Sequence, residues 1–202
     1  MHLMRLQPII VPGWKGSGPA HWQSLWETRL PRAVRVQQAN WDLPVLQDWV
    51  KTVAHAITSA SRPPLLIAHS LGCITVAHLP MAIRQQVAGA LLVAPADVER
   101  PGAPPVLQDF APVPRLPLHF PSIVVASTDD PYCRPDRARE FAADWGSDIV
   151  ELPDAGHIND VSNLGHWPQG LRLLATLRRR AGWRVPVAAD RITAMPAPSR
   201  HS

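Results

Sequence analysis

A serine that follows a buried-looking apolar run is the first candidate for chemistry. Residues 65–72 form an apolar strand pattern that ends in Ala-His-Ser-Leu-Gly, with Ser70 at its centre. A sharp strand-to-helix turn lifts such a side chain clear of the backbone, and the positions two before and two after it must be small. Ala68 and Gly72 meet this requirement. The pattern predicts a nucleophilic serine, although a serine that simply caps a helix would look the same.

A serine hydroxyl becomes a good nucleophile only when a base takes its proton and an acid orients that base. Asp129 and Asp130 follow one apolar run, at 123–126, and His157 follows the next, at 149–152. A serine, then an acid after a later strand, then a histidine after the last strand is the order used for acyl transfer on an α/β sheet. We therefore expect Ser70, Asp130 and His157 to form a catalytic triad. The simpler interpretation is that the two aspartates cap the following helix and that His157 lies in a surface loop.

The choice between the two aspartates depends on the following residue. Pro131 fixes the backbone after Asp130 and places Asp130 at the turn, which favours it as the triad acid. Asp129 would then be a neighbour that accepts backbone hydrogen bonds. The sequence leaves the opposite assignment open.

Acyl transfer also needs donors for the negative oxygen that forms in the tetrahedral intermediate. We expect the N–H of Leu71 and the N–H of Trp14, in the glycine-rich loop at 11–19, to supply them. Gly13, Trp14 and His69 lie beside the nucleophile and are the expected substrate-binding residues. The glycine spacing in this loop does not match a phosphate-binding loop.

The elements that must position these residues alternate along the chain. Continuous apolar runs are typical of strands buried on both faces of a parallel sheet. The predicted strands cover 8–11, 34–36, 65–68, 90–93, 123–126 and 149–152, and the predicted helices roughly 20–30, 44–60, 72–86, 136–146 and 168–180. The chain is therefore expected to be an α/β protein with a mostly parallel, six-stranded sheet flanked by helices and no large cap domain.

Two stretches interrupt the alternation. Residues 101–121 carry seven prolines, which exclude a regular helix or a central strand there. We expect an excursion at the edge of the sheet, either a stiff surface loop or a flap over a pocket. Residues 183–202 have no helical period, so the predicted organisation is one domain over 1–182 and a basic, poorly ordered tail over 183–202.

Composition and charge exclude several classes of protein. Of the net charge of +4, residues 172–202 contribute seven Arg against one Asp, whereas residues 1–171 hold 13 Arg and Lys against 15 Asp and Glu. The basic character belongs to the C-terminal part, which makes nucleic acid an improbable partner. Cys73 and Cys133 form no disulfide or metal pattern, so we expect no metal and a cytoplasmic location. No apolar run is long enough for a membrane span, and no signal peptide is evident.

Together these motifs resemble a known group. They are similar to motifs of the small α/β-hydrolases related to retinoblastoma-binding protein nine. The motifs are Val11-Pro12-Gly13-Trp14 with Trp22, the strand-to-helix turn at 68–72 (called the elbow below), Ser-Thr-Asp-Asp-Pro at 127–131 and Gly-His-Ile-Asn at 156–159. Gly-His-Trp-Pro at 165–168 resembles the bacterial, esterase-like members. The resemblance covers about residues 7–178. It implies a minimal α/β-hydrolase fold and a triad of Ser70, Asp130 and His157.

The expected function is hydrolysis of a small acyl ester, thioester or amide through an acyl-enzyme, without a cofactor. The partner is then a small acyl substrate, and the chain is expected to be a monomer or a small homo-oligomer. The alternative function is that of a non-catalytic binding protein on a hydrolase scaffold, which would need no triad.

Overall fold

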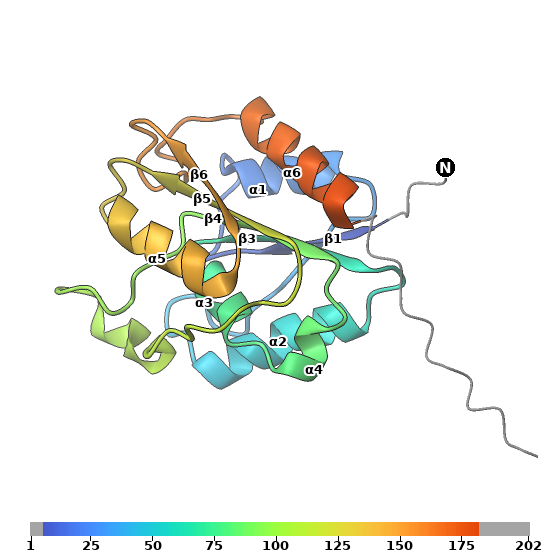
Figure 1. Cartoon of the computed structure of the whole chain (residues 1–202), viewed down its shortest axis with the longest axis horizontal. Coiled ribbons are helices and arrows are strands. Elements are labelled where there is room, and N and C mark those ends of the chain that lie inside the picture. Colours follow the sequence, from blue (N-terminus) through green and yellow to red (C-terminus); the bar gives the residue numbers. More distant parts are fainter. Residues whose placement is uncertain (1–5, 182–202) are drawn as a thin grey trace, which may run out of the picture.

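The computed structural model describes residues 6–181 of the 202-residue chain. Six parallel strands form one sheet in the order β2-β1-β3-β4-β5-β6 (Figure 1). This confirms the predicted six-stranded α/β sheet. The strands are β1 (Gln7–Val11), β2 (Val34–Arg35), β3 (Pro64–His69), β4 (Gly89–Val93), β5 (Ser122–Ser127) and β6 (Asp148–Leu152).

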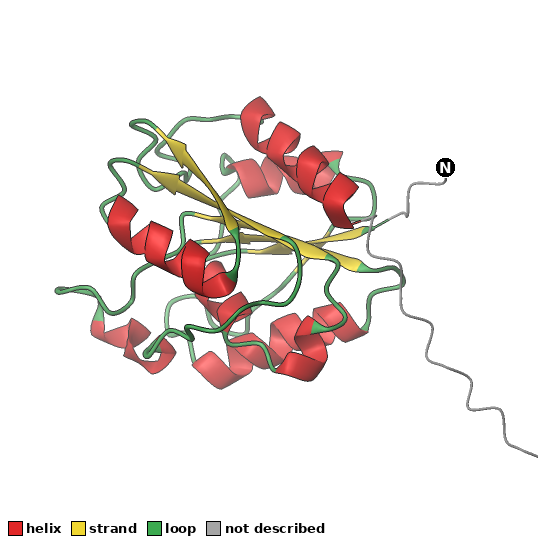
Figure 2. Cartoon of the chain, in the orientation of Figure 1, coloured by secondary structure: helices red, strands yellow, loops and turns green. Residues whose placement is uncertain are grey.

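Helices cover both faces of the sheet (Figure 2). Helices α1 and α6 lie on one face, and α2 to α5 lie on the other (Figure 1). Their bounds are α1 (Trp22–Arg29), α2 (Leu46–Thr58), α3 (Leu71–Ala77), α4 (Met81–Arg84), α5 (Pro135–Trp145) and α6 (Pro168–Ala181). The single helix predicted over 72–86 is wrong. It is two short helices, because Pro80 has no backbone N–H to donate and ends the first of them.

Alternate residues of each central strand enter two separate cores, which explains the continuous apolar runs in the sequence. One core lies under α2, α3 and α5, and the other under α1 and α6. Side chains of the strands in the first core include Ile9, Leu66, Leu92 and Val124. Those in the second include Ile10, Ile67, Leu91 and Val125.

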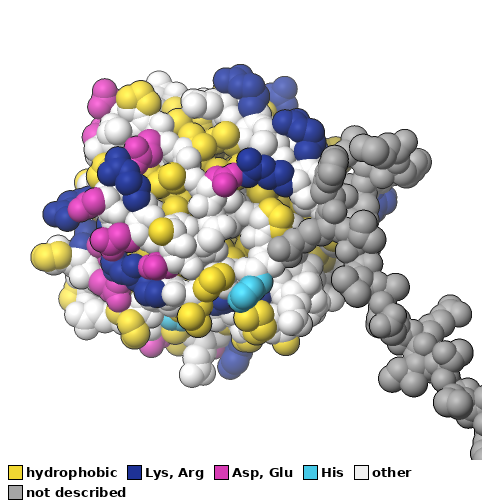
Figure 3. Space-filling view, in the orientation of Figure 1, with side chains coloured by type: hydrophobic (Ala, Val, Ile, Leu, Met, Phe, Trp, Pro, Cys, Tyr) yellow, Lys and Arg dark blue, Asp and Glu magenta, His cyan; other side chains and the backbone are white. Residues whose placement is uncertain are grey.

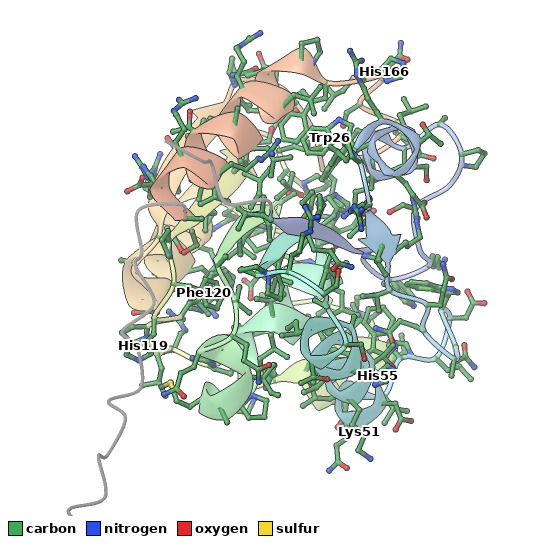
Figure 4. The ribbon with its side chains drawn as sticks, turned by 90° about the vertical axis from the view of Figure 1, so that its right-hand side faces the viewer. Trp26, Lys51, His55, His119, Phe120 and His166 are labelled. Atoms are coloured by element: carbon green, nitrogen blue, oxygen red, sulfur yellow. The ribbon has the colours of Figure 1, made fainter. Side chains whose placement is uncertain are left out.

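Tryptophans connect α1 to the chain before α6. Trp22 and Trp26 are buried in the core, as expected, and both rings contact Trp167. The indole N–H of Trp26 donates to the carbonyl of His166 at 2.9 Å, and Figure 4 shows these two residues at the same end of the molecule. Lys51 and His55, in contrast, lie on α2 in the other helical layer (Figure 4). These contacts hold the segment after His157 against the sheet.

The proline-rich excursion connects β4 to β5, which are neighbouring strands inside the sheet, so its predicted place at the sheet edge is wrong. It leaves the carboxyl end of β4 and contains no α-helix, as expected, but it includes a short 3₁₀ helix, Pro105–Phe110, that was not predicted. A short 3₁₀ turn tolerates proline in its first residues, where no N–H partner is needed. The Arg84 side chain is buried and donates to the carbonyls of Leu79 and Pro117, which fixes the end of the excursion.

The predicted tail at 183–202 lies outside the described residues. Within residues 6–181, no helix is long and apolar enough to cross a membrane. Basic side chains gather over α6, whose last turn carries Arg178, Arg179 and Arg180 (Figure 3). Arg180 is paired with Asp148.

Candidate active site

The candidate nucleophile stands at a strained turn between β3 and α3. Ser70 has φ 53° and ψ −121°, an arrangement that a residue with a side chain adopts only at an energetic cost. The surroundings leave little room, because a Cβ added to Gly72 would lie 2.5 Å from the carbonyl oxygen of Val11. The small residue two positions after Ser70 is therefore required by the approach of the β1 loop to the elbow.

The three predicted triad residues form one hydrogen-bonded chain. The Nε2 atom of His157 lies 2.8 Å from the Oγ of Ser70. Its Nδ1 lies 2.9 Å and 3.0 Å from the two carboxylate oxygens of Asp130, whose side chain is almost fully buried. Because an ionised carboxylate accepts hydrogen bonds only, Nδ1 carries the proton and Nε2 can accept the serine proton. This arrangement can support nucleophilic catalysis.

Asp130, and not Asp129, thus contacts the histidine. Asp129 accepts hydrogen bonds from the hydroxyl of Ser127 at 2.6 Å and from the N–H of Gly156 at 2.7 Å. These two bonds lower the pKa of the Asp129 carboxyl and keep it ionised. Ser127 also accepts from the N–H of Ala155 at 2.9 Å, so the end of β5 holds the loop that presents His157.

Two backbone amides at the other side of Ser70 are the expected oxyanion donors. Leu71 begins α3, where an N–H has no acceptor within the helix. Trp14 follows Gly13 in a turn that is closed by the N–H of Gly16 donating to Gly13 at 3.0 Å. The indole N–H of Trp14 donates to the carbonyl of Asp42 at 3.0 Å and fixes the position of Trp14. The backbone N–H of Trp14 takes part neither in this bond nor in the bond that closes the turn.

A cavity of about 470 Å³ opens over Ser70 and His157. Trp14 and His69, two of the predicted substrate-binding residues, line it, and so do Pro104 and Leu107 from the excursion. The excursion therefore contributes to the wall of the pocket, which favours the flap interpretation over a plain surface loop. A second hollow, about 430 Å³, lies beside His157 and is lined by its loop and Tyr132.

Gly13 does not line this cavity. It packs behind the wall instead, where an added Cβ would lie 2.7 Å from the Cβ of Ser70. Its predicted substrate contact stays a prediction, whereas its packing is plain: the chain can approach Ser70 this closely only without a side chain.

His69 is buried and its Nε2–H donates to the backbone carbonyl of His157 at 2.9 Å. Burial and the nearby His157 hold the pKa of His69 well below its usual value, so the ring is neutral. This hydrogen bond holds the backbone of His157, the candidate base.

Sequence reasoning missed His21, which lines the same cavity from the start of α1. A histidine before a short helix is a weak signal, and only the packing brings its ring to 4.8 Å from that of His69. Among residues 6–181, no group of three or more His, Cys, Asp or Glu side chains has the geometry to hold a metal ion.

The serine hydrolase family profile matches residues 8–176, which is most of the chain and includes the whole site. This chain belongs to the serine hydrolase family. The resemblance to hydrolases related to retinoblastoma-binding protein nine is consistent with this family.

Solved structures agree with this membership. A YdeN-like hydrolase from Pectobacterium atrosepticum is 33% identical to this serine hydrolase and superimposes with a TM-score of 0.78. The match covers 88% of this chain and 92% of the Pectobacterium chain. The ydeN gene product of Bacillus subtilis is 22% identical, with 86% and 98% of the two chains covered and a TM-score of 0.67. An esterase from Thermogutta terrifontis is 18% identical, with 91% and 86% covered and a TM-score of 0.64, and shares the fold. No curated protein is significantly similar in sequence.

Proposed function

We propose that this serine hydrolase cleaves a small acyl ester, or a related thioester or amide, by acyl transfer to water. The unbroken chain of hydrogen bonds from Asp130 through His157 to the Oγ of Ser70 supports this function most directly. A binding protein on the same scaffold would have no need for three such groups in a catalytic order.

In the first half of the reaction, Ser70 Oγ attacks the substrate carbonyl carbon while His157 Nε2 takes the hydroxyl proton. The carbonyl oxygen becomes negative in the tetrahedral intermediate, and the amides of Leu71 and Trp14 donate to it. Asp130 stabilises the imidazolium that forms. His157 then gives its proton to the leaving group as the bond from carbon to the leaving atom breaks, which leaves an acyl-Ser70 ester.

Water repeats these steps in the second half. His157 removes a proton from the water as its oxygen attacks the acyl carbon, and the proton returns to Ser70 Oγ when the acid product leaves. Every proton transfer is made by a side chain or by water, so we expect no cofactor.

The size of the cavity favours a small acyl group. At about 470 Å³ it falls at the lower end of the range for small-molecule sites. The esterase from Thermogutta terrifontis shares the fold, and its structure has propionate bound, which is consistent with short acyl chains.

Labelling with a fluorophosphonate probe tests the proposed nucleophile. We expect the probe to attach to Ser70, and Ser70→Ala to lose both labelling and hydrolysis of p-nitrophenyl pentanoate. Ser59→Ala is the matched control, because Ser59 is exposed after α2 and lies outside the cavity. Wild-type activity in Ser70→Ala, or a label on another serine, would reject the triad, and folded wild-type protein without label or turnover would favour the binding protein.

The partners and compartment follow from the same proposal. We expect a small acyl substrate, no binding to nucleic acid, and a monomer or small homo-oligomer. Cys73 and Cys133 are both unpaired and buried, which supports a reducing compartment such as the cytoplasm.

A further inference from the structure

His21 is the buried polar side chain in the cavity that the acyl-transfer chemistry leaves without a role. It is 2% exposed and lines the cavity together with His69 and Ser70. Its ring lies 4.8 Å from that of His69, which in turn lies 4.9 Å from that of His157. A row of three imidazoles therefore leads from the catalytic base into the cavity wall at the start of α1.

The hydrogen bonds around His21 fix which ring nitrogen carries the proton. Its Nδ1 accepts from the backbone N–H of Gln23 at 3.1 Å and so caps α1. Burial lowers the pKa of His21 to about 4, so the ring is neutral near pH 7. A neutral imidazole that accepts through Nδ1 must carry its hydrogen on Nε2. Nε2 is therefore a donor.

This donor has no acceptor among residues 6–181 of the protein. A buried donor without a partner is destabilising, and such groups in native proteins commonly meet a ligand or water. The nearby acid of the cavity, Asp160, uses its Oδ1 to accept from the N–H of Val161, and it makes no hydrogen bond to His21. The missing acceptor is then expected to come from a molecule in the cavity.

The position of the leaving group decides which part of a substrate would reach His21. His157 must protonate the leaving atom, so the leaving group departs on the side of His157 and its loop, where the second hollow lies. The acyl chain then extends into the larger cavity, where His21 lies beyond His69.

We propose that His21 determines substrate specificity by donating its Nε2–H to an oxygen on the acyl chain, beyond the scissile carbonyl. This inference depends on the proposed acyl-transfer function and narrows its substrate class. The preferred substrates are esters of short acids that carry a ketone, ether or carboxylate oxygen a few bonds from the reacting carbon, rather than esters of simple alkanoic acids.

Two esters with the same leaving group and chain length test this specificity: p-nitrophenyl levulinate, which has a ketone at C4, and p-nitrophenyl pentanoate, which has none. The quantity to compare is the ratio of their kcat/KM values within each variant, because the amount of active enzyme cancels. We expect this ratio to fall about tenfold in His21→Asn and to stay within about threefold of wild type in His21→Gln.

These two variants separate recognition from helix capping. Asparagine keeps a good cap for Gln23 but lacks a donor at the Nε2 position, whereas glutamine places an amide donor near that position but caps poorly. We expect the melting temperature to fall more in His21→Gln than in His21→Asn, the reverse of the effect on the ratio.

A wild-type ratio in folded His21→Asn would overturn the proposal, because the cap alone would then explain His21. An equal fall in both folded variants would also overturn it, since the shape of the ring and not its donor would be responsible. Loss of the proposed function is a different result: wild-type protein would hydrolyse neither ester, or Ser70→Ala would hydrolyse both.

Discussion

Replacing Gly13 by alanine should impair catalysis without unfolding the protein. A Cβ at position 13 would lie 2.7 Å from the Cβ of Ser70 and 3.0 Å from the carbonyl oxygen of His69. Ordinary contacts begin near 3.4 Å. Opening the contact from 2.7 Å to 3.4 Å requires a movement of about 0.7 Å by the elbow or by the loop after β1.

Such a movement acts directly on the reacting groups. The bond of 2.8 Å between Ser70 Oγ and His157 Nε2 would lengthen toward the limit of a hydrogen bond, and the Trp14 amide would move away from the oxyanion. A misplacement near 1 Å lowers rates by about 100-fold, so we expect kcat/KM to fall by roughly 10- to 100-fold. Overpacking of this kind costs about 1–3 kcal/mol of folding stability, or several degrees of melting temperature.

The assay compares kcat/KM for p-nitrophenyl pentanoate, the rate of fluorophosphonate labelling, and the melting temperature. Gly18→Ala is the matched control, since Gly18 is in the same loop and an added Cβ meets no atom within 4 Å. We expect Gly18→Ala to change kcat/KM far less than Gly13→Ala. Wild-type kcat/KM in Gly13→Ala, or an equal loss in both variants, would refute the steric reasoning.

Three further predictions concern the support of the site and of the fold. Asp130→Asn should lower kcat by about 10⁴-fold, because it fixes the wrong imidazole tautomer of His157. Asp129→Asn should lower kcat by roughly tenfold, because the loop that carries His157 is held less firmly. Equal losses of kcat in steady-state kinetics would contradict this order. Because the folded pKa of His21 is about 4 and its unfolded value is 6.5, the unfolded chain binds more protons between these values, so stability should fall as pH drops from 6.5 to 4. Urea unfolding across that range should show a smaller fall in His21→Asn, and an unchanged pH slope would count against the buried neutral ring. Arg84→Met should reduce the unfolding free energy by about 2–4 kcal/mol, because the backbone carbonyls of Ala77, Leu79 and Pro117 lose their donor. Chemical denaturation with a wild-type midpoint would exclude this role.

Much of the fold was predictable because local chemistry and packing agree. The inner strands β1, β3, β4 and β5 are buried on both faces, so their apolar runs are visible in the sequence without knowledge of their partners. Pro80 shows where local reasoning was incomplete, because the apolar pattern across 72–86 predicted one helix and the proline ended it. The 3₁₀ helix in the excursion was missed for the opposite reason, since prolines that forbid a long helix are compatible with the start of a short one.

The sequence by itself determined the order of serine, acid and histidine and the small residues that the turn around Ser70 requires. These follow from the local demands of a strand that ends in a sharp turn, so residue type and spacing carry them. The choice of Asp130 over Asp129 was different. Both follow β5, and only the direction of each side chain in space places one against His157 and the other against Gly156.

Tertiary structure alone also decided what surrounds Ser70. His21 and His69 are 48 positions apart in sequence, and they meet because β1 and β3 are neighbours in the sheet. The same pairing brings Gly13 against Ser70, and the packing of the excursion places Leu107 on the cavity wall. A contact between distant segments depends on how the sheet is ordered and covered, which no local pattern of residues encodes.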